Sequence, residues 1–198
     1  MNRRHFLGSA AAGVGLFGAR GVWAQPAVVS TLDTLIGRAH RFIQWHSDVL
    51  LLRDRIAVAD FSGPSSVPRF HIVDLVSGAI TSDLVTHGKG SDPDHTGTLQ
   101  RFSNDMGSLA TSAGSYVTGD IYEGVHGTSM RLKGLDYANS NAENRAIVIH
   151  AAPYATPAHL AQWGKLGRSE GCFAVDPARL HEIMAMIGPG RMLYADRA

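Results

Sequence analysis

The stretch Arg145-Ala146-Ile147-Val148-Ile149-His150 contains an apolar run that ends in a histidine. Short apolar runs rich in β-branched residues are typical of buried strands. We therefore expect a strand over residues 145–150, with the imidazole of His150 at the edge of a sheet, where a site can open. A loop and a glycine-flanked turn then lead to Cys172, the only cysteine of the 198-residue chain.

Two helices are expected outside this stretch. Ser30 and Asp33 form an N-cap pattern ahead of apolar residues at helical spacing, which predicts an amphipathic helix over residues 31–52. A second helix is expected over residues 177–187, with Asp176 as its N-cap and proline in its first turn.

The remaining segments predict a mainly β protein of the α+β class. Ser77-Gly78 resembles a tight turn, so the first three strands are expected to form a meander. Segment 88–115 is polar and has no clear period, which is more typical of a binding loop than of a linker. The other expected strands cover residues 56–61, 70–75, 80–87, 116–122, 129–132 and 191–194.

The first 24 residues have the pattern of a twin-arginine export signal. Arg3-Arg4 precedes the apolar run 8–19. Val22-Trp23-Ala24 then offers small residues at the two positions that a signal peptidase reads, so the mature protein is expected to begin near Gln25. The run is much shorter than the roughly 20 residues that span a bilayer. We expect a periplasmic or cell-envelope protein with no stable membrane span after signal removal. An uncleaved N-terminal anchor is the alternative.

Three parts of the chain follow from this division: a signal peptide over residues 1–24, an N-terminal helical segment over 25–53 and a catalytic domain over 54–198.

The formal net charge is only +1, and no run of Lys and Arg is present. Binding to many phosphates needs a concentrated basic face, so no nucleic-acid partner is expected.

A single cysteine in an exported protein cannot form an internal disulfide, so a reactive role for Cys172 is worth weighing. An imidazole such as that of His150 can take the thiol proton, and the amides of Gly171 and Cys172 could face an oxyanion. From spacing alone, a buried structural cysteine and a structural histidine remain equally open.

Several segments, taken in order, resemble the murein L,D-transpeptidase catalytic domain of the YkuD type, in a divergent branch. The main ones are His150-Ala151-Ala152-Pro153-Tyr154 and Gly167-Arg168-Ser169-Glu170-Gly171-Cys172-Phe173-Ala174-Val175. The resemblance also includes Asp60-Phe61-Ser62, His87-Gly88, Phe102-Ser103-Asn104, Gly124-Val125-His126-Gly127-Thr128-Ser129 and Asn141-Ala142-Glu143-Asn144-Arg145.

This resemblance implies a sandwich-like β fold with an N-terminal helix and a helix after the cysteine. It also implies Cys172 as nucleophile, His150 as base and later acid, and the Ala151 carbonyl as the group that orients the imidazole. The implied substrate is a peptidoglycan stem tetrapeptide, which loses D-alanine to form a thioester. An amine then gives a 3-3 cross-link, and water gives a tripeptide. Carbapenem-type β-lactams are implied inhibitors, and neither route needs a metal or another cofactor.

The chain departs from the commoner motif around the cysteine. Glu170 stands where many relatives have His, and the usual Arg or Asn after the cysteine is missing, so we expect Arg168 to bind a substrate carboxylate. A surface pair of Arg168 with Glu170 is the alternative. The other expected substrate-binding residues are Ser169, His126, Asn104 and Tyr154.

His126 is also the second candidate for the base. A metal site of His87, His95 and His126 is the less favoured interpretation, because these residues lack the close spacing of zinc ligands. Two other functions remain open: a cysteine amidase or endopeptidase that uses Cys172 and His150, and a non-catalytic wall-binding module with an inert thiol.

Overall fold

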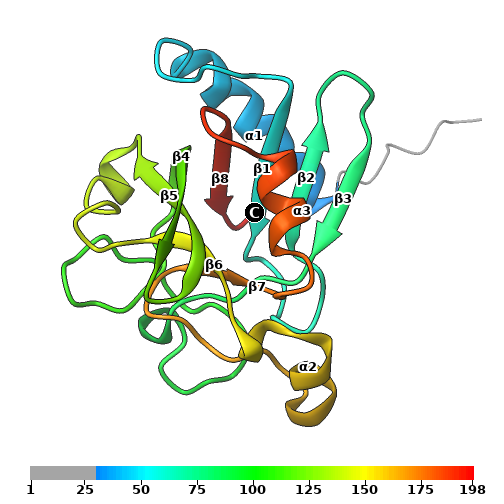
Figure 1. Ribbon diagram of the computed structural model, residues 1–198, viewed down its shortest axis with the longest axis vertical. Coiled ribbons are helices and arrows are strands. Elements are labelled where there is room, and N and C mark those ends of the chain that lie inside the picture. The colour runs from blue at the N-terminus through cyan, green and yellow to red at the C-terminus, as the bar shows by residue number, and fades with distance from the viewer. Residues whose placement is uncertain (1–29) are drawn as a thin grey trace, which may run out of the picture.

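The computed structural model describes residues 30–198, so the predicted signal peptide and the start near Gln25 lie outside the described residues. Figure 1 shows one mixed sheet with α1 beside one end of it and α2 projecting at the opposite end of the molecule. The helices are α1 Thr31–Trp45, α2 Pro157–Trp163 and α3 Leu180–Met186, with 3-10 turns η1 Lys89–Ser91, η2 Tyr137–Asn139 and η3 Pro153–Ala155. The strands are β1 Arg55–Asp60, β2 Phe70–Asp74, β3 Ile80–Asp83, β4 Gly114–Gly124, β5 Gly127–Gly134, β6 Val148–Ala151, β7 Phe173–Val175 and β8 Met192–Asp196.

The eight strands follow the order β3-β2-β1-β8-β4-β5-β6-β7. Strands β1, β2 and β3 form the predicted meander, and Gly78 has the positive φ of 75° that its turn requires. Strands β1 and β8 pair in parallel, as do β6 and β7, and the other neighbours are antiparallel. The expected mainly β α+β class is confirmed.

One face of the sheet curves around the larger core. Phe61 follows β1 and Phe173 lies in β7 at the far edge of the sheet, yet their ring centroids are only 6.2 Å apart. Tyr116 of β4 meets Phe173 edge-on at 5.6 Å. The curved sheet therefore provides both layers of the sandwich, and α3 adds Leu180, Ile183 and Met184 to this core.

The smaller core lies on the other face, beneath α1. The predicted capping box is present, since Ser30 Oγ accepts from Asp33 N at 3.0 Å, and Leu35, Ala39 and Ile43 turn one helix face onto the sheet. The helix ends at Trp45 and not at residue 52. His46 leaves the helical conformation and bonds Asp136 Oδ1 at 3.0 Å, which fixes the turn there.

Near the cysteine the structure differs from the expected elements. Helix α3 begins at Leu180 because the Asp176 side chain holds a turn, accepting from Ala178 N at 2.9 Å. Helix α2 and the three-residue strand β7 were not predicted. No helix in the part of the chain from residue 30 onward has the length and apolarity needed to cross a membrane.

Candidate active site

Cys172 lies in a tight turn at the start of β7. Gly171 has a φ of 122°, and a Cβ atom there would come within 2.9 Å of the Ala110 carbonyl oxygen, so the turn needs glycine. The hydroxyl of Ser169 donates to the Cys172 carbonyl at 2.7 Å and accepts from Gly171 N at 3.2 Å. Ser169 thus fixes the backbone that carries the sulfur.

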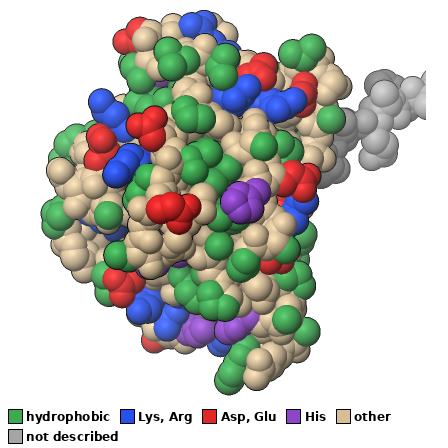
Figure 2. All heavy atoms as spheres, in the orientation of Figure 1, with side chains coloured by type: hydrophobic (Ala, Val, Ile, Leu, Met, Phe, Trp, Pro, Cys, Tyr) green, Lys and Arg blue, Asp and Glu red, His purple; other side chains and the backbone are tan. Residues whose placement is uncertain are grey.

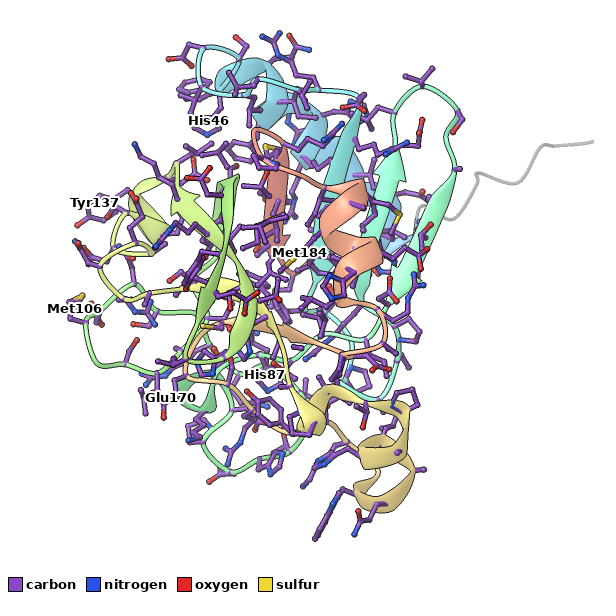
Figure 3. The ribbon with its side chains drawn as sticks, viewed as in Figure 1. His46, His87, Met106, Tyr137, Glu170 and Met184 are labelled. Atoms are coloured by element: carbon purple, nitrogen blue, oxygen red, sulfur yellow. The ribbon has the colours of Figure 1, made fainter. Side chains whose placement is uncertain are left out.

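The cysteine turn is held against the segment that follows β3. Ser169 N donates to the His87 carbonyl at 3.0 Å, and Lys89 N donates to the Ser169 carbonyl at 2.8 Å. Figure 3 shows His87 and Glu170 on the loops at the same end of the molecule. This strand-like pairing ties the cysteine turn to the polar segment 88–115.

Behind this pairing, a buried polar network fixes His87. Arg69 Nη2 donates to His87 Nδ1 at 2.8 Å, and His87 Nε2 lies 3.3 Å from Asp92 Oδ2, with all three residues almost fully buried. Burial, together with the nearby Arg69 charge, lowers the pKa of His87 to about 4. The ring is therefore neutral, accepting at Nδ1 and donating at Nε2.

His150 sits near the end of β6, paired with Ser129 of β5. Its Nδ1 lies 2.8 Å from the Ala151 carbonyl oxygen, which can only accept, so Nδ1 carries the proton and Nε2 presents a lone pair. Burial lowers the pKa of His150, and His126 adds to that effect, while the Ala151 carbonyl opposes it. The imidazole is a neutral base in the resting protein.

The thiol of Cys172 also rests in its neutral form. Its Sγ donates to the Ala146 carbonyl oxygen at 3.4 Å. Burial raises the pKa of the thiol, and Glu170 adds to this, whereas a backbone hydrogen bond from Val148 and the Arg145 charge lower it. Within residues 30–198 the structure shows no hydrogen bond between Cys172 and His150. The expected hydrogen bond between the thiol and the imidazole is thus not made in this state.

Both groups nevertheless line one cleft of about 210 Å³. Its walls are formed by Lys89, His126, His150, Tyr154, Arg168, Ser169, Glu170 and Cys172. The rings of His126 and His150 stack with centroids 4.3 Å apart and an angle of 19° between their planes. A thiol and a neutral imidazole in one cleft are the nucleophile and the base that acyl transfer to a cysteine uses.

The family model of the L,D-transpeptidase catalytic domain matches residues 34–195. The chain belongs to this family. Solved structures of L,D-transpeptidases are similar to this chain at low sequence identity, and a comparison with curated proteins finds no match.

Three solved structures illustrate the likeness. The match to an L,D-transpeptidase from Mycobacterium smegmatis has 13% sequence identity and a TM-score of 0.44, and it covers 72% of this chain and 58% of that protein. LdtMt1 in complex with imipenem has 15% identity, a TM-score of 0.44, and coverage of 72% and 59%. A mutant of the helical cell shape determining protein Pgp2 from Campylobacter jejuni has 15% identity, a TM-score of 0.48, and coverage of 77% and 53%. This chain thus spans a little over half the length of these proteins.

The cleft of this L,D-transpeptidase-family protein brings together six of the predicted site residues: Cys172, His150, His126, Tyr154, Arg168 and Ser169. The Ala151 carbonyl is adjacent, on His150 Nδ1. Lys89 and Arg145 were missed. Lys89 directly follows the His87-Gly88 motif, and Arg145 closes the Asn141 to Arg145 motif, so both lay next to signals already noted.

Two predicted positions need correction. Asn104 lies outside the cleft, because its amide nitrogen donates to the Tyr137 carbonyl at 2.9 Å and its oxygen accepts from Asn141 N at 3.0 Å. The Gly171 amide does not face open space for an oxyanion, because it donates to Ser169 Oγ. Both groups serve to hold loops in place.

Arg168 does not pair with Glu170, as the alternative interpretation had it. Its guanidinium donates to the carbonyl oxygens of Asp92 and Pro93, the latter at 2.9 Å, while Lys89 Nζ bonds Glu170 Oε1 at 3.3 Å. No carboxylate within residues 30–198 pairs with Arg168, so no ion pair in that range compensates its positive charge. Among residues 30–198, no three His, Cys, Asp or Glu side chains are grouped so that they could hold a metal ion.

Proposed function

We propose that this protein is a cysteine acyltransferase that acts on peptidoglycan stem tetrapeptides, as an L,D-transpeptidase or an L,D-carboxypeptidase. The observation that carries the proposal is the neutral His150, whose Nδ1 is held by Ala151 and which shares a cleft with the Cys172 thiol. An imidazole oriented in this way is ready to accept a proton at Nε2.

The first half-reaction begins when substrate enters and the thiol leaves the Ala146 carbonyl. The Sγ proton passes to His150 Nε2, and the thiolate attacks the carbonyl between the third residue of the stem and D-alanine. When the tetrahedral intermediate collapses, the bond to D-alanine breaks and His150 returns the proton to the leaving amine. A thioester on Cys172 remains.

The second half-reaction reverses the roles. An amine of another stem attacks the thioester, His150 takes its proton, and the thiolate leaves and recovers that proton, which releases a 3-3 cross-linked product. Water in place of the amine releases a tripeptide.

Positive charge at the cleft suits the carboxylates of a stem peptide. Within the part of the chain that the structure describes, Arg168 pairs with no carboxylate and donates hydrogen bonds through Nη1 alone. Arg forks bind carboxylates well, so we assign Arg168 to a substrate carboxylate, with Tyr154 and His126 as further walls of the subsite.

Inhibition and location belong to the same proposal. LdtMt1 has been solved in complex with imipenem, and an attack of Cys172 on the β-lactam carbonyl would open the ring by the same chemistry. An increase in the mass of the intact protein that matches the carbapenem, and that is lost in Cys172→Ala, would support Cys172 as the nucleophile.

We also propose export by the twin-arginine pathway to the cell envelope, where the murein lies.

The deciding experiment is incubation of purified protein with disaccharide-tetrapeptides, followed by separation and mass analysis of the products. Cross-linked dimers indicate a transpeptidase and tripeptides a carboxypeptidase, and Cys172→Ala must yield neither. Release of the whole stem from the sugar would indicate an amidase and overturn the proposal. An unchanged substrate with folded wild-type protein would favour a wall-binding module.

A further inference from the structure

Helix α2 contributes no residue to a hydrophobic core. None of its seven residues is buried, yet both ends are capped: Thr156 Oγ1 accepts from His159 N at 3.1 Å, and Gly164 closes the helix with a φ of 69°. Short helices normally depend on tertiary packing of one face. A helix that is capped at both ends but has no fully buried residue is suited to present its side chains to a ligand.

A cavity of about 410 Å³ lies beside α2, lined by His95, His159, Trp163, Lys165 and Gly167. The Trp163 side chain is 60% exposed, and its ring lies 6.1 Å from that of His159 at an angle of 32°. Figure 2 shows His side chains together with Lys and Arg at the end of the molecule that carries α2. The cavity thus combines an open aromatic face with hydrogen-bond donors.

This cavity adjoins the cleft that holds Cys172. Gly167 lines the α2 cavity, and the next residue, Arg168, lines the cleft. Gly167 N also donates to the Tyr154 carbonyl at 2.9 Å, and a Cβ on Gly167 would lie only 2.5 Å from Tyr154 Cβ. The two spaces share this wall, so a ligand whose reacting carbonyl lies at Cys172 can extend past Tyr154 to Trp163.

The side chains at the α2 cavity fit an uncharged saccharide. The apolar face of a pyranose ring stacks on an exposed indole, and its hydroxyl and acetamido groups accept hydrogen bonds. The indole N–H of Trp163 and the ring of His159 make no hydrogen bond to residues 30–198. Lys165 Nζ donates to the His95 carbonyl, so the lining groups left without a partner in residues 30–198 are the two rings, which suit a sugar.

We infer that the α2 cavity binds the N-acetylated sugar to which the stem peptide is attached, with Trp163 as its stacking platform. This inference rests on the proposed function, because it places the sugar and the reacting carbonyl of one substrate in adjoining sites. The protein then prefers a disaccharide-tetrapeptide over the same tetrapeptide without sugar.

The test compares KM for the disaccharide-tetrapeptide with KM for the free tetrapeptide. Trp163→Ala is expected to raise the KM for the disaccharide-tetrapeptide about tenfold relative to the KM for the free tetrapeptide. This is the effect of losing roughly one stacking contact. Trp163→Phe keeps an aromatic face and should retain most of the preference. Trp45→Ala is the matched control, because Trp45 is 81% exposed at the end of α1 and should leave the ratio unchanged. Circular dichroism verifies that each variant is folded.

A binding measurement separates this inference from the proposed function. In Trp45→Phe protein, titration with the N-acetylated disaccharide alone should change the tryptophan fluorescence. Adding Trp163→Phe removes the indole that reports binding and should abolish the change in fluorescence. A protein that turns over neither substrate but shows this binding would refute the proposed function and retain the sugar site. Absence of disaccharide binding, or an equal effect of Trp163→Ala on both KM values, would overturn the sugar site.

Discussion

The Cys172 sulfur donates to the carbonyl oxygen of Ala146, and Ala146 itself has a positive φ of 51°. Such a conformation is uncommon for a residue other than glycine. It closes the turn that precedes β6, where Ile147 N donates to the Ala142 carbonyl at 2.9 Å. The same turn therefore begins the strand that carries His150 and supplies the acceptor that holds the resting thiol.

The first prediction concerns the reactivity of that thiol. Because burial raises its pKa, the thiolate fraction at neutral pH is small, and alkylation by iodoacetamide should be slow and accelerate as pH rises. Glu170→Gln removes a negative charge that raises the pKa and should speed alkylation at a fixed pH. Rates followed by intact mass test both points. A thiol that is already largely ionised at pH 7 would contradict them.

Arg145 is predicted to support both the thiol and the polar loop. Its guanidinium donates to the Ser103 carbonyl and to Ser112 Oγ, each at 2.7 Å, and to the Ala110 carbonyl. Arg145→Met should lower the free energy of unfolding by on the order of 2 kcal/mol, because buried acceptors lose their donor.

Arg145→Met should also shift the alkylation profile of Cys172 to higher pH, because the Arg145 charge lowers the thiol pKa. Arg131→Met is the control: Arg131 lies over the Tyr122 ring at 4.1 Å and should change stability by less than about 1 kcal/mol. Equal effects of the two variants on the thiol would argue against the assigned role.

His87 is predicted to make the fold sensitive to mild acid. Its pKa falls from 6.5 to about 4 on folding, so between these values the unfolded state binds the extra proton. Stability is then fully present above pH 6.5 and falls toward pH 4, by up to about 3 kcal/mol. Urea unfolding at several pH values measures this.

His87→Gln should flatten that dependence of stability on pH, even if the variant is less stable overall. His181→Gln, at an exposed position on α3, should keep the slope of the parent protein. Identical slopes for all three proteins would show that His87 does not titrate as expected.

Two glycines give opposite predictions for the same substitution. At Gly171, alanine meets the Ala110 carbonyl and a φ of 122°, so Gly171→Ala should destabilise by about 1–3 kcal/mol and disturb the cysteine turn. At Gly37, within α1, a Cβ meets nothing within 4 Å, so Gly37→Ala should stabilise by about 0.5–1 kcal/mol. Thermal unfolding compares them, and a neutral Gly171→Ala would refute the tight turn.

Elements with strong local signals could be predicted from the sequence. The capping box at Ser30 fixes where α1 begins, although the helix ends seven residues before its expected end. The hairpin glycine Gly78 and the apolar run before His150 place the meander and β6 close to their expected positions. Helix α2 was missed because it has no apolar face, and β7 because three residues carry no period.

Cys172, His150 and the Ala151 carbonyl could be proposed for the site because their segments resemble the family motif, whereas spacing alone left structural roles open for the thiol and the imidazole. Contacts between distant segments were not predictable. Asn104 was misplaced because its partners Tyr137 and Asn141 lie more than 30 positions away, and the Gly171 amide because the Ser169 rotamer cannot be read from sequence.

The hydrogen bond from Cys172 to Ala146 also bears on how long the protein lasts in use. Peroxides and stray disulfides attack the thiolate, and damage beyond the first oxidation step is irreversible. A protonated sulfur in a residue only 8% exposed offers them little to attack. The same contact that, in the proposed mechanism, holds the thiol until substrate enters therefore also protects the sulfur from oxidation.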